Sequence, residues 1–483
     1  MAYWFSSRCF LPFAMVVLLG SGGVVVVLST NQVSNTGTSS YRWEPTSATG
    51  THWAHGWFDY GATPRTSIVS SWNGSWLSQQ YKLTIPAGVG VDDLNLAYDS
   101  SRGRFVFATL DLYVPSDDVW YGYSTDSTGT SWVVKSIVFQ GNGSSGATWD
   151  YPSIGVDGSG RIIIGAVSFG TTGCPPNESP CPNGYYSAVS TDGSNFSSPA
   201  LVTLGTSPGF GARSRVVATS NVFEAFVPTL NASWEPTQIN RWQSSNGTSW
   251  SGPNLLANFG APNNNSPPGT TQIFYAPLLA AQGYTNGLWT VAFQINNGGF
   301  NNAEICTSDR GCGIVNSVGS DQFLVGSSVS GDSGYWVSYY TYTSAPRTLP
   351  LITQAIYFPP GKAGIGATTN TGIDPTSWLL TSPSIARCPN TSCYAAGDFQ
   401  TVASNPYASA STPFIKQSSH HNDLFQSFIE DPQGTSAAAF VPNTIWFPLG
   451  ADVSSLAGAG PEQPGMPPGL TIGAPGAHTS AVP

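Results

Sequence analysis

A short turn motif returns along this chain about every 60 residues, and this spacing constrains the fold more than any other feature. The three clearest copies end in an aromatic residue and span Ser124–Trp132, Ser190–Phe196 and Ser244–Trp250. Weaker copies end at Trp76 and Trp378, and the segment Cys306–Cys312 stands where a degenerate copy is due. A period of about 60 residues that holds four short strands is typical of a β-propeller blade.

A second pattern runs in phase with the turns. Asp92–Asp99 alternates apolar and polar residues, and a Gly/Ser turn and an apolar segment from Arg104 follow. Asp150–Asp157 repeats this arrangement, with the second apolar segment starting at Arg161. Each unit predicts two antiparallel strands joined by a tight turn. Looser counterparts begin near Arg213, Tyr275, Tyr335 and Asp398.

Six turn motifs predict an all-β fold, a six-bladed β-propeller of four-stranded antiparallel blades, with seven blades as the alternative. Residues 398–430 are expected to supply inner strands to the blade whose turn ends at Trp76. Pairing the two ends of the chain in this way closes the ring and removes an exposed sheet edge. The chain then divides into residues 1–34, a signal peptide or membrane anchor, residues 35–450, the propeller, and residues 451–483, a disordered Gly/Pro-rich tail.

The composition agrees with this fold and excludes several others. Only 9% of the 483 residues are charged, against about 25% in an average soluble domain. Coiled coils and helical bundles need many more charged helix formers, and the abundant aromatic residues argue against disorder of the whole chain. The net charge of −10 argues against nucleic acid as a partner, since binding it requires Lys and Arg to neutralise phosphates.

The N-terminus and the cysteines indicate export. Residues 11–28 carry no charge and follow Arg8, which predicts a signal peptide or a single anchor. The protein is therefore expected to be secreted or extracytoplasmic, and to contact a membrane only through residues 11–28 if they stay uncleaved. Six cysteines form three local pairs that predict disulfides; zinc is disfavoured because no pair has C-x-x-C spacing or a nearby His. The pairs are Cys174 with Cys181, Cys306 with Cys312, and Cys388 with Cys393.

The turn motif resembles the Asp box, or bacterial neuraminidase repeat, of the sialidase superfamily, which reads S-x-D-x-G-x-T-W. The resemblance extends over residues 73–378 through the turns and their phase, although individual copies are one residue longer or shorter. It implies a propeller that acts on or binds glycans, a glycoside hydrolase of exo-α-sialidase type being one form. Propellers with this motif also include proteins without catalysis, so the fold leaves the activity open.

The turn residues themselves are expected to be structural. The carboxylates of Asp126 and Asp192 can accept hydrogen bonds from backbone N–H groups of their own turns, as in Asx turns. Asn246 offers a neutral version, and the aromatic residue is expected to pack between adjacent sheets. The structural set is Asp126, Trp132, Asp192, Phe196, Asn246, Trp250, Asp374 and Trp378.

Strand direction places the candidate site at the opposite end of the blades. Where turn motifs join strands three and four, the first strands begin at the other end, around the central opening. Carboxylates, tyrosines and arginines that meet there suit a sugar; the structural alternative is that the acids cap inner strands and the arginines form ion pairs. The catalytic candidates are Asp93, Asp150, Tyr275 and Asp398, and the substrate-binding candidates are Tyr151, Arg213, Arg215, Asp117 and Asp118.

The resemblance to sialidases implies a more specific set of site residues: three arginines, a Tyr–Glu pair and an Asp, in a fixed order along the chain. That order is matched by Arg42, Asp59, Glu224, Arg241, Arg310 and one of Tyr339, Tyr340 and Tyr342. However, Arg241 and Arg310 lie close to turn motifs and should not reach the central opening. We therefore interpret the match of order as a coincidence.

Other chemistry finds little support in the sequence. No nucleophile elbow, zinc-protease motif or phosphate loop is present. The paired histidines, His52 with His55 and His420 with His421, read as polar loop residues rather than metal ligands. No cofactor or metal is expected, with calcium at Asp117 and Asp118 as the one alternative. The partner is a glycan or glycoprotein; the rival functions are a glycoside hydrolase, a non-catalytic binding propeller and a structural protein of the cell envelope.

Overall fold

The computed structural model describes the strands of the chain and many of its turns. Its described residues are 31–32, 42–50, 52–59, 66–72, 81–85, 91–111, 117–141, 149–168, 183–205, 214–230, 236–258, 279–284, 286–297, 300–315, 321–331, 333–344, 348–360, 378–386, 402–404, 424–430 and 441–447. These segments consist of strands, turns and bends. Across the same segments, no helix is long and apolar enough to cross a membrane.

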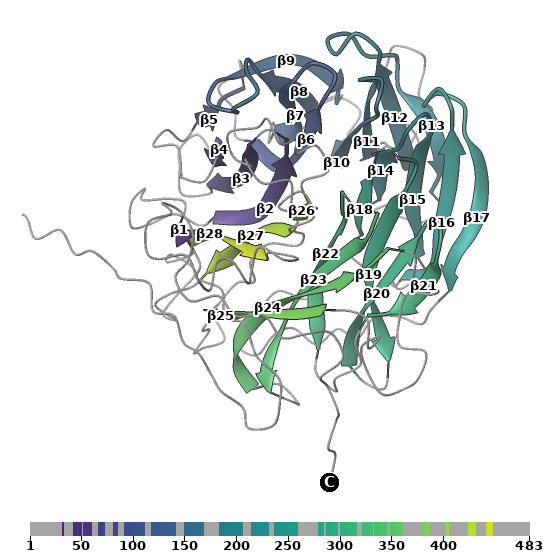
Figure 1. The fold of residues 1–483 in the computed structure, drawn as a ribbon. Helices are drawn as coiled ribbons and strands as arrows, with labels where there is room; N and C mark the ends of the chain where they lie inside the picture. Colours follow the sequence, from purple (N-terminus) through teal and green to yellow (C-terminus); the bar gives the residue numbers. More distant parts are fainter. Residues whose placement is uncertain are drawn as a thin grey trace, which may run out of the picture.

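Twenty-eight strands form seven antiparallel sheets of four strands each, arranged radially around a common centre (Figure 1). Blade 1 contains β2 (Arg42–Thr49), β3 (Trp53–Asp59), β4 (Thr66–Trp72) and β5 (Tyr81–Leu83). Blade 2 contains β6 (Val91–Asp99), β7 (Arg104–Asp111), β8 (Val119–Ser124) and β9 (Trp132–Phe139). Blade 3 contains β10 (Trp149–Val156), β11 (Ile162–Ser168), β12 (Gly184–Ser190) and β13 (Ala200–Leu204).

The remaining blades repeat this arrangement. Blade 4 contains β14 (Arg215–Ala218), β15 (Phe223–Leu230), β16 (Pro236–Ser244) and β17 (Ser251–Asn258). Blade 5 contains β18 (Ala280–Gly283), β19 (Trp289–Asn297), β20 (Phe300–Thr307) and β21 (Gly311–Ile314). Blade 6 contains β22 (Gln322–Val329), β23 (Tyr335–Ser344), β24 (Thr348–Phe358) and β25 (Trp378–Ala386). Blade 7 contains β26 (Val402–Ser404), β27 (Leu424–Glu430), β28 (Val441–Phe447) and β1 (Asn31–Gln32).

The all-β propeller of four-stranded antiparallel blades is thus confirmed, with seven blades rather than six. The turn motif joins strands three and four, and blade 7 has no such connection because its fourth strand, β1, comes from the other end of the chain. Counting turns therefore misses this blade. The chain ends do pair, as Asn31 opposite Thr444, but in a blade of their own. Blade 1 takes its inner strands from β2 and β3, and not from residues 398–430.

The two in-phase segments are the inner strand pairs of blades 2 and 3. Asp99 lies opposite Arg104, and Val156 opposite Ile162. In blade 6 the first strand was predicted to begin near Tyr335, but Tyr335 begins the second strand, β23. Both inner strands of a blade are buried and apolar, so the pattern of apolar residues does not distinguish them.

The turn motifs hold their loops through hydrogen bonds to one side-chain oxygen. Asp126 Oδ1 accepts from the backbone nitrogens of Thr128 and Gly129, at 2.9 and 2.8 Å. Asp192 Oδ1 accepts two such bonds of 2.8 Å, and Asn246 Oδ1 accepts two of 2.9 Å. The following glycine takes a positive φ of 70° to 73° in all three turns (Gly129, Gly193 and Gly247), which other residues adopt at a cost.

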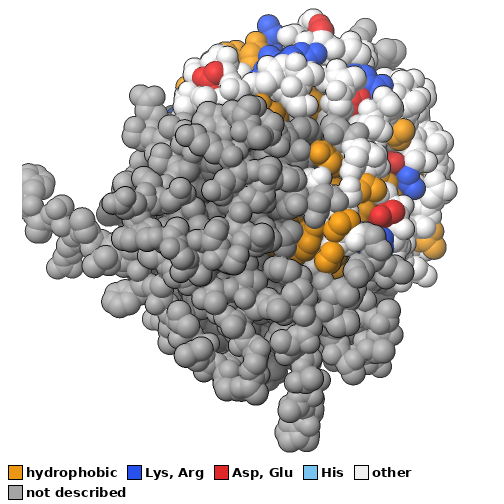
Figure 2. All heavy atoms as spheres, in the orientation of Figure 1, with side chains coloured by type: hydrophobic (Ala, Val, Ile, Leu, Met, Phe, Trp, Pro, Cys, Tyr) orange, Lys and Arg blue, Asp and Glu red, His pale blue; other side chains and the backbone are white. Residues whose placement is uncertain are grey.

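The aromatic residue that ends each motif packs between two blades. Trp132 is 3% exposed and contacts the apolar cluster between blades 1 and 2. Phe196 packs against the cluster between blades 2 and 3, and Trp250 against the cluster between blades 3 and 4. The described core is therefore a series of apolar layers, one between each pair of neighbouring blades from blade 1 to blade 6. On the face shown in Figure 2, the charged side chains of the described surface lie in small groups among uncharged and apolar ones.

Arginines connect blade 2 to blade 3 and blade 3 to blade 4 at the end that carries the turn motifs, which we call the turn-motif face. Arg102 and Arg104 of blade 2 donate to the carbonyl oxygens of Gly160 and Gly193 in blade 3, at 2.7 and 2.8 Å. Arg161 of blade 3 donates to Ser245 O of blade 4 at 2.7 Å. Asp99 and Asp157, both fully buried, pair with these arginines. The charges at this face are engaged in holding neighbouring blades together.

Candidate functional site

The opposite end of the blades, which we call the strand-start face, carries β-bulges in the first strands of blades 1, 2, 3 and 6, and those of blades 2 and 3 contain candidate residues. In blade 2 the register shifts between Asp92 and Asn95, and in blade 3 between Asp150 and Ser153. Asp93 and Tyr151 take positive φ values of 48° and 51°, a conformation that is uncommon outside glycine and that often marks functional sites. A bulge redirects the side chains around it.

Each bulge is supported by the aspartate that precedes it. Asp92 Oδ1 accepts the backbone N–H of Asp93 at 3.0 Å, and Asp150 Oδ1 accepts that of Tyr151 at 2.8 Å. Asp92 and Asp150 therefore hold equivalent positions, and so do Asp93 and Tyr151. Asp150, expected to be catalytic, is thus an acceptor for its own bulge, whereas the Asp93 carboxyl, 7% exposed by residue, belongs to a group of acids.

This acidic group comprises Asp93, Asp111, Asp117 and Asp118. Burial raises the pKa of Asp117 to about 6, and the nearby charges of Asp111, Asp118 and Asp93 add to the effect. Asp117 accepts no hydrogen bond from the described residues. Burial also raises the pKa of Asp118 to about 6, against the opposing effect of a 2.6 Å bond from Gly141 N. Two half-buried carboxyl groups therefore titrate close to neutral pH.

Asp111 is a member of this group that the sequence did not indicate. It ends β7, and its carboxylate accepts the N–H of Asp118 at 2.7 Å and the indole N–H of Trp120 at 2.8 Å. These bonds fix the connection between β7 and β8 and hold Asp117 beside its neighbours. The available signal was an acid at the end of an apolar strand, seven residues before Asp118.

A central cavity of about 90 Å³ lies between the inner strands of blades 1 to 6, and in blades 1 to 3 its lining comes from the last residues of those strands rather than from the bulges or the acidic group. Most of its wall consists of small side chains such as Ser153, Ala280 and Ser327, and Arg215 is the charged residue in it. Arg215 is 4% exposed and donates through Nη1 to the carbonyl oxygen of Ser214 at 3.0 Å. It begins β14, so its charge lies at the strand-start end of the inner wall.

A hydrogen-bonded pair beside Arg215 fixes blade 3 against blade 4. Ser153 Oγ lies 2.9 Å from Tyr185 Oη and accepts the N–H of Val216 at 3.0 Å. Burial raises the pKa of Tyr185, and the Ser153 hydroxyl and the Arg215 charge oppose that change. Tyr151 packs against the same apolar cluster. Arg215 therefore stands in a rigid part of the wall.

The residues of the sialidase-like order do not converge at this face. Glu224 and Arg241 form a bidentate pair, with both N–O distances at 2.8 Å, and the Arg241 guanidinium lies over the Trp289 ring of blade 5. Arg310 donates to the carbonyl oxygen of Pro359 at 2.6 Å and lies over the Tyr335 ring. Both arginines thus connect neighbouring blades, which agrees with interpreting the order as coincidental.

The structure corrects the reading of one histidine pair. His55 lies in β3, fully buried, with its ring between those of Trp53 and Trp57 at centroid distances of 6.1 and 5.0 Å. Burial lowers the pKa of His55 to about 3. His52 is also buried, so neither residue belongs to an exposed polar loop. The tryptophan-rich surroundings of this strand were the signal for burial.

Several predicted residues fall outside the described part of the chain. The disulfide Cys306–Cys312 is observed, between facing positions of β20 and β21. Of Trp378 only the backbone is described, at the start of β25. Outside the described residues lie Tyr275, Asp398, Arg213, Asp374, Cys174, Cys181, Cys388, Cys393, His420, His421, the leader segment 11–28 and the tail 451–483. The calcium alternative at Asp117 and Asp118 stays a prediction.

Comparison with known proteins adds structural neighbours but no family. No family model matches the chain, and no curated protein matches it either. An α-L-arabinanase from Penicillium chrysogenum, complexed with arabinobiose, is 9% identical, with 88% of this chain and 98% of that chain covered and a TM-score of 0.44.

Two further solved structures are similar to the same extent. An α-L-arabinofuranosidase from Fusarium graminearum is 10% identical, with 87% and 97% of the two chains covered and a TM-score of 0.44. A protein of unknown function from Dyadobacter fermentans is 12% identical, with 89% and 100% covered and a TM-score of 0.44. With TM-scores below 0.5, these similarities carry no argument about activity.

Proposed function

We propose that this propeller binds a glycan at the strand-start face and hydrolyses it with the carboxyl groups of blade 2. The observation that carries the proposal is Asp117, a half-buried carboxyl with a pKa of about 6 and no hydrogen bond from the described residues, next to Asp93. Glycoside hydrolysis requires one carboxyl that keeps a proton near neutral pH and a second that is ionised.

The two acids take different roles in this proposal. Asp117, protonated below about pH 6, donates its proton to the leaving glycosidic oxygen. Asp93, held by its bulge, is the carboxylate that activates water or attacks the sugar. Asp117 was expected only to bind substrate, and its surroundings support the acid role instead. Asp111 positions Asp117, because it fixes the neighbouring Asp118 and Trp120.

The remaining groups of this face suit a sugar. Tyr151 presents a partly exposed ring on the neighbouring bulge, and aromatic rings stack on sugars through their apolar faces. Arg215 supplies a positive charge at the inner wall, where an anionic substituent would be held. An exo-sialidase is one member of this substrate class. The disulfide supports action outside the cytosol, where such bonds persist.

The test is hydrolysis of aryl glycosides of neutral, amino and acidic sugars, sialosides included, followed by variants on the best substrate. We expect Asp117→Asn and Asp93→Asn each to lower kcat by about 10²- to 10⁴-fold, and Asp126→Asn, at the turn-motif face, to leave it unchanged. For the parent protein, kcat/KM should fall as pH rises above about 6 because Asp117 loses its proton. Glycan binding without turnover, or turnover that survives Asp117→Asn, would contradict this assignment.

A further inference from the structure

The hairpin of β20 and β21 places three metal-ligating side chains on one side of blade 5. Cys306 and Cys312 face each other across the two strands, and Glu304 lies two residues before Cys306 on β20. Successive side chains of a strand point to opposite faces, so Glu304 and Cys306 share a face. One carboxylate oxygen and the two sulfur atoms all lie within 4.8 Å of one another.

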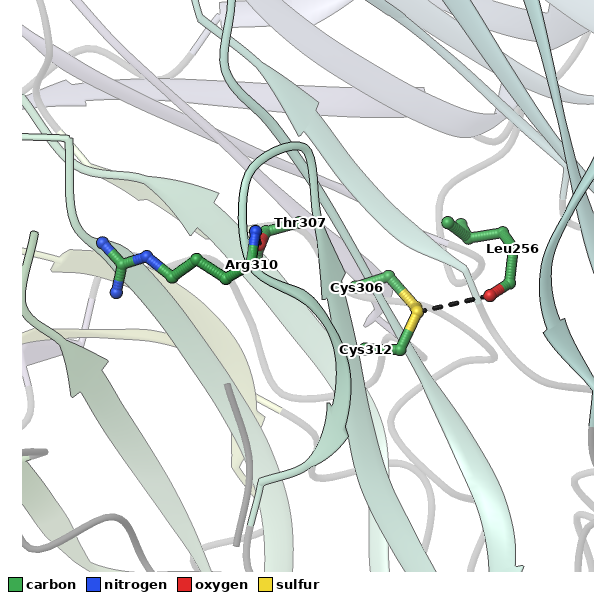
Figure 3. Close-up of a disulfide and its surroundings, with 5 residues drawn as sticks. All are labelled: Leu256, Cys306, Thr307, Arg310 and Cys312. Atoms are coloured by element: carbon green, nitrogen blue, oxygen red, sulfur yellow. Dashed lines mark hydrogen bonds between the residues drawn. A yellow bond between two sulfur atoms is a disulfide. The ribbon is translucent and has the colours of Figure 1, made fainter. Parts of the chain in front are cut away.

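The neighbouring blade covers part of this cluster and leaves Cys312 exposed. Cys306 is fully buried in the apolar layer between blades 4 and 5. Cys312 lies at the rim, with its Sγ 3.4 Å from the carbonyl oxygen of Leu256 in β17 (Figure 3). In a disulfide that sulfur carries no proton, so the carbonyl oxygen gains a hydrogen bond only when Cys312 is a thiol. The surroundings therefore accommodate the reduced pair as well as the oxidised one.

Among the residues that the structure describes, none neutralises the charge of Glu304. It makes no hydrogen bond or ion pair with the described residues, although it is largely withdrawn from water. A carboxylate in such a position gains from a nearby cation, which would compensate the cost of its burial.

We propose that reduction of the Cys306–Cys312 disulfide opens a binding site for a soft divalent cation such as Zn²⁺ or Cd²⁺. The ligands are the two thiolates and the Glu304 carboxylate; water or the Leu256 carbonyl oxygen takes the fourth position of a tetrahedron. Thiolates select such cations over Mg²⁺ or Ca²⁺, and three protein ligands with one further position is an established arrangement for zinc. The oxidised hairpin lacks thiolates and should bind none.

Reduction of the Cys306–Cys312 disulfide requires two electrons and two protons. A trialkylphosphine transfers two electrons to the disulfide and is oxidised to its oxide with the oxygen of one water, whose two protons give the two thiols. On binding, the cation displaces both thiol protons into solvent.

The usual sequence signals of a zinc site, C-x-x-C spacing and a nearby His, are absent from this hairpin. Its third ligand is instead a carboxylate on the same strand face as Cys306.

The test is a Cd²⁺ titration of the full chain, followed by the ultraviolet thiolate-to-Cd²⁺ charge-transfer band. The first protein retains only this cysteine pair, with serine at the other five positions: Cys9→Ser, Cys174→Ser, Cys181→Ser, Cys388→Ser and Cys393→Ser. After reduction by the phosphine we expect one bound Cd²⁺, displaced by Zn²⁺, and none before reduction. Should this variant not fold, the reduced parent chain must bind one Cd²⁺ more than Cys306→Ser/Cys312→Ser.

Two single variants test the third ligand. Glu304→Gln should weaken Cd²⁺ binding by on the order of tenfold or more. Asp309→Asn removes a carboxylate from the turn of the same hairpin and should leave the affinity unchanged. No difference between the reduced parent and the double serine variant would overturn the proposal, and so would an unaltered affinity in Glu304→Gln.

Discussion

The two ends of blades 2 and 3 hold aspartates in different surroundings, and Asp157 and Asp117 show the contrast. At the turn-motif face the aspartates are surrounded by donors: Asp157, fully buried, accepts three hydrogen bonds on Oδ1 and the Arg161 guanidinium on Oδ2. At the strand-start face Asp117 accepts no hydrogen bond from the described residues and lies beside three other acids. The donors around Asp157 stabilise the folded protein, whereas the acids around Asp117 do not.

This difference shows how function can be sought in a chain with few charges. Only 26 of the 483 residues are acidic, so their presence at either face is informative, but their partners decide what they do. Donors around a carboxylate lower its pKa and stabilise the fold. Crowded carboxylates raise each other's pKa at a cost in stability, a cost that enzymes accept at their active sites.

The largest effect is expected from Arg161→Ala at the turn-motif face. The substitution removes the partner of a buried carboxylate and the bonds to Ser245 O and Asn221 O in blade 4. Losing one partner of a buried ion pair costs about 3 kcal/mol in the free energy of unfolding. Chemical denaturation followed by tryptophan fluorescence measures the change.

Arg161→Lys serves as the control for that variant. It keeps the charge and loses the planar fork that reaches three acceptors, so it should recover only part of the loss. If Arg161→Ala were as stable as the parent, the turn-motif face would not be the structural end of the blades.

A smaller loss is expected from Asp126→Ala in the blade 2 turn. The Asp126 carboxylate accepts from three backbone N–H groups and from the Thr128 and Thr130 hydroxyls. Although partial burial acts to raise its pKa, these bonds outweigh burial and lower it. We expect Ala to cost about 1.5 kcal/mol and Asn nearly nothing, since Asn246 makes the same turn. Equal losses in both variants would show that charge, rather than the acceptor oxygen, holds the turn.

The smallest effect, and the one of opposite sign, is expected from Asp117→Asn. The folded protein binds the Asp117 proton more tightly than the unfolded chain, with a pKa of about 6 against 3.8. The resulting destabilisation is complete above pH 6 and vanishes as pH falls below about 4. Because the group is half exposed, the variant should be more stable than the parent by only about 0.5 to 1 kcal/mol at pH 7.5. Thermal unfolding at pH 7.5 and pH 4 measures it; destabilisation at pH 7.5 would place Asp117 with the structural acids.

The sequence indicated those parts of the fold that depend on local chemistry. The turns at Asp126, Asp192 and Asn246 have a recognisable sequence because their hydrogen bonds are made within a few residues. Blade 7 could not be counted, because its closing strand comes from the far end of the chain and needs no turn. The first and second strands of blade 6 were confused at Tyr335 because both are buried on both faces.

The candidate site could likewise be predicted from the sequence only in part. The position of Asp93 and Tyr151 at one face followed from strand direction alone. The role of Asp117 did not, because its raised pKa depends on burial and on Asp111, which a different strand supplies. The third ligand-type side chain beside Cys306 was also missed, since a carboxylate two residues away is no recognised metal motif.

The pairing of β1 with β28 also sets an order in time. Asn31 and Gln32 leave the ribosome more than 400 residues before their partners, Thr444 and Asn443. At roughly 5–20 residues per second, synthesis of the intervening chain takes about 20–80 s. Blades 1 to 6 can form within that interval, each from contiguous chain. The last blade must wait until β28 has been synthesised, so the ring stays open until then and closes in a single late step.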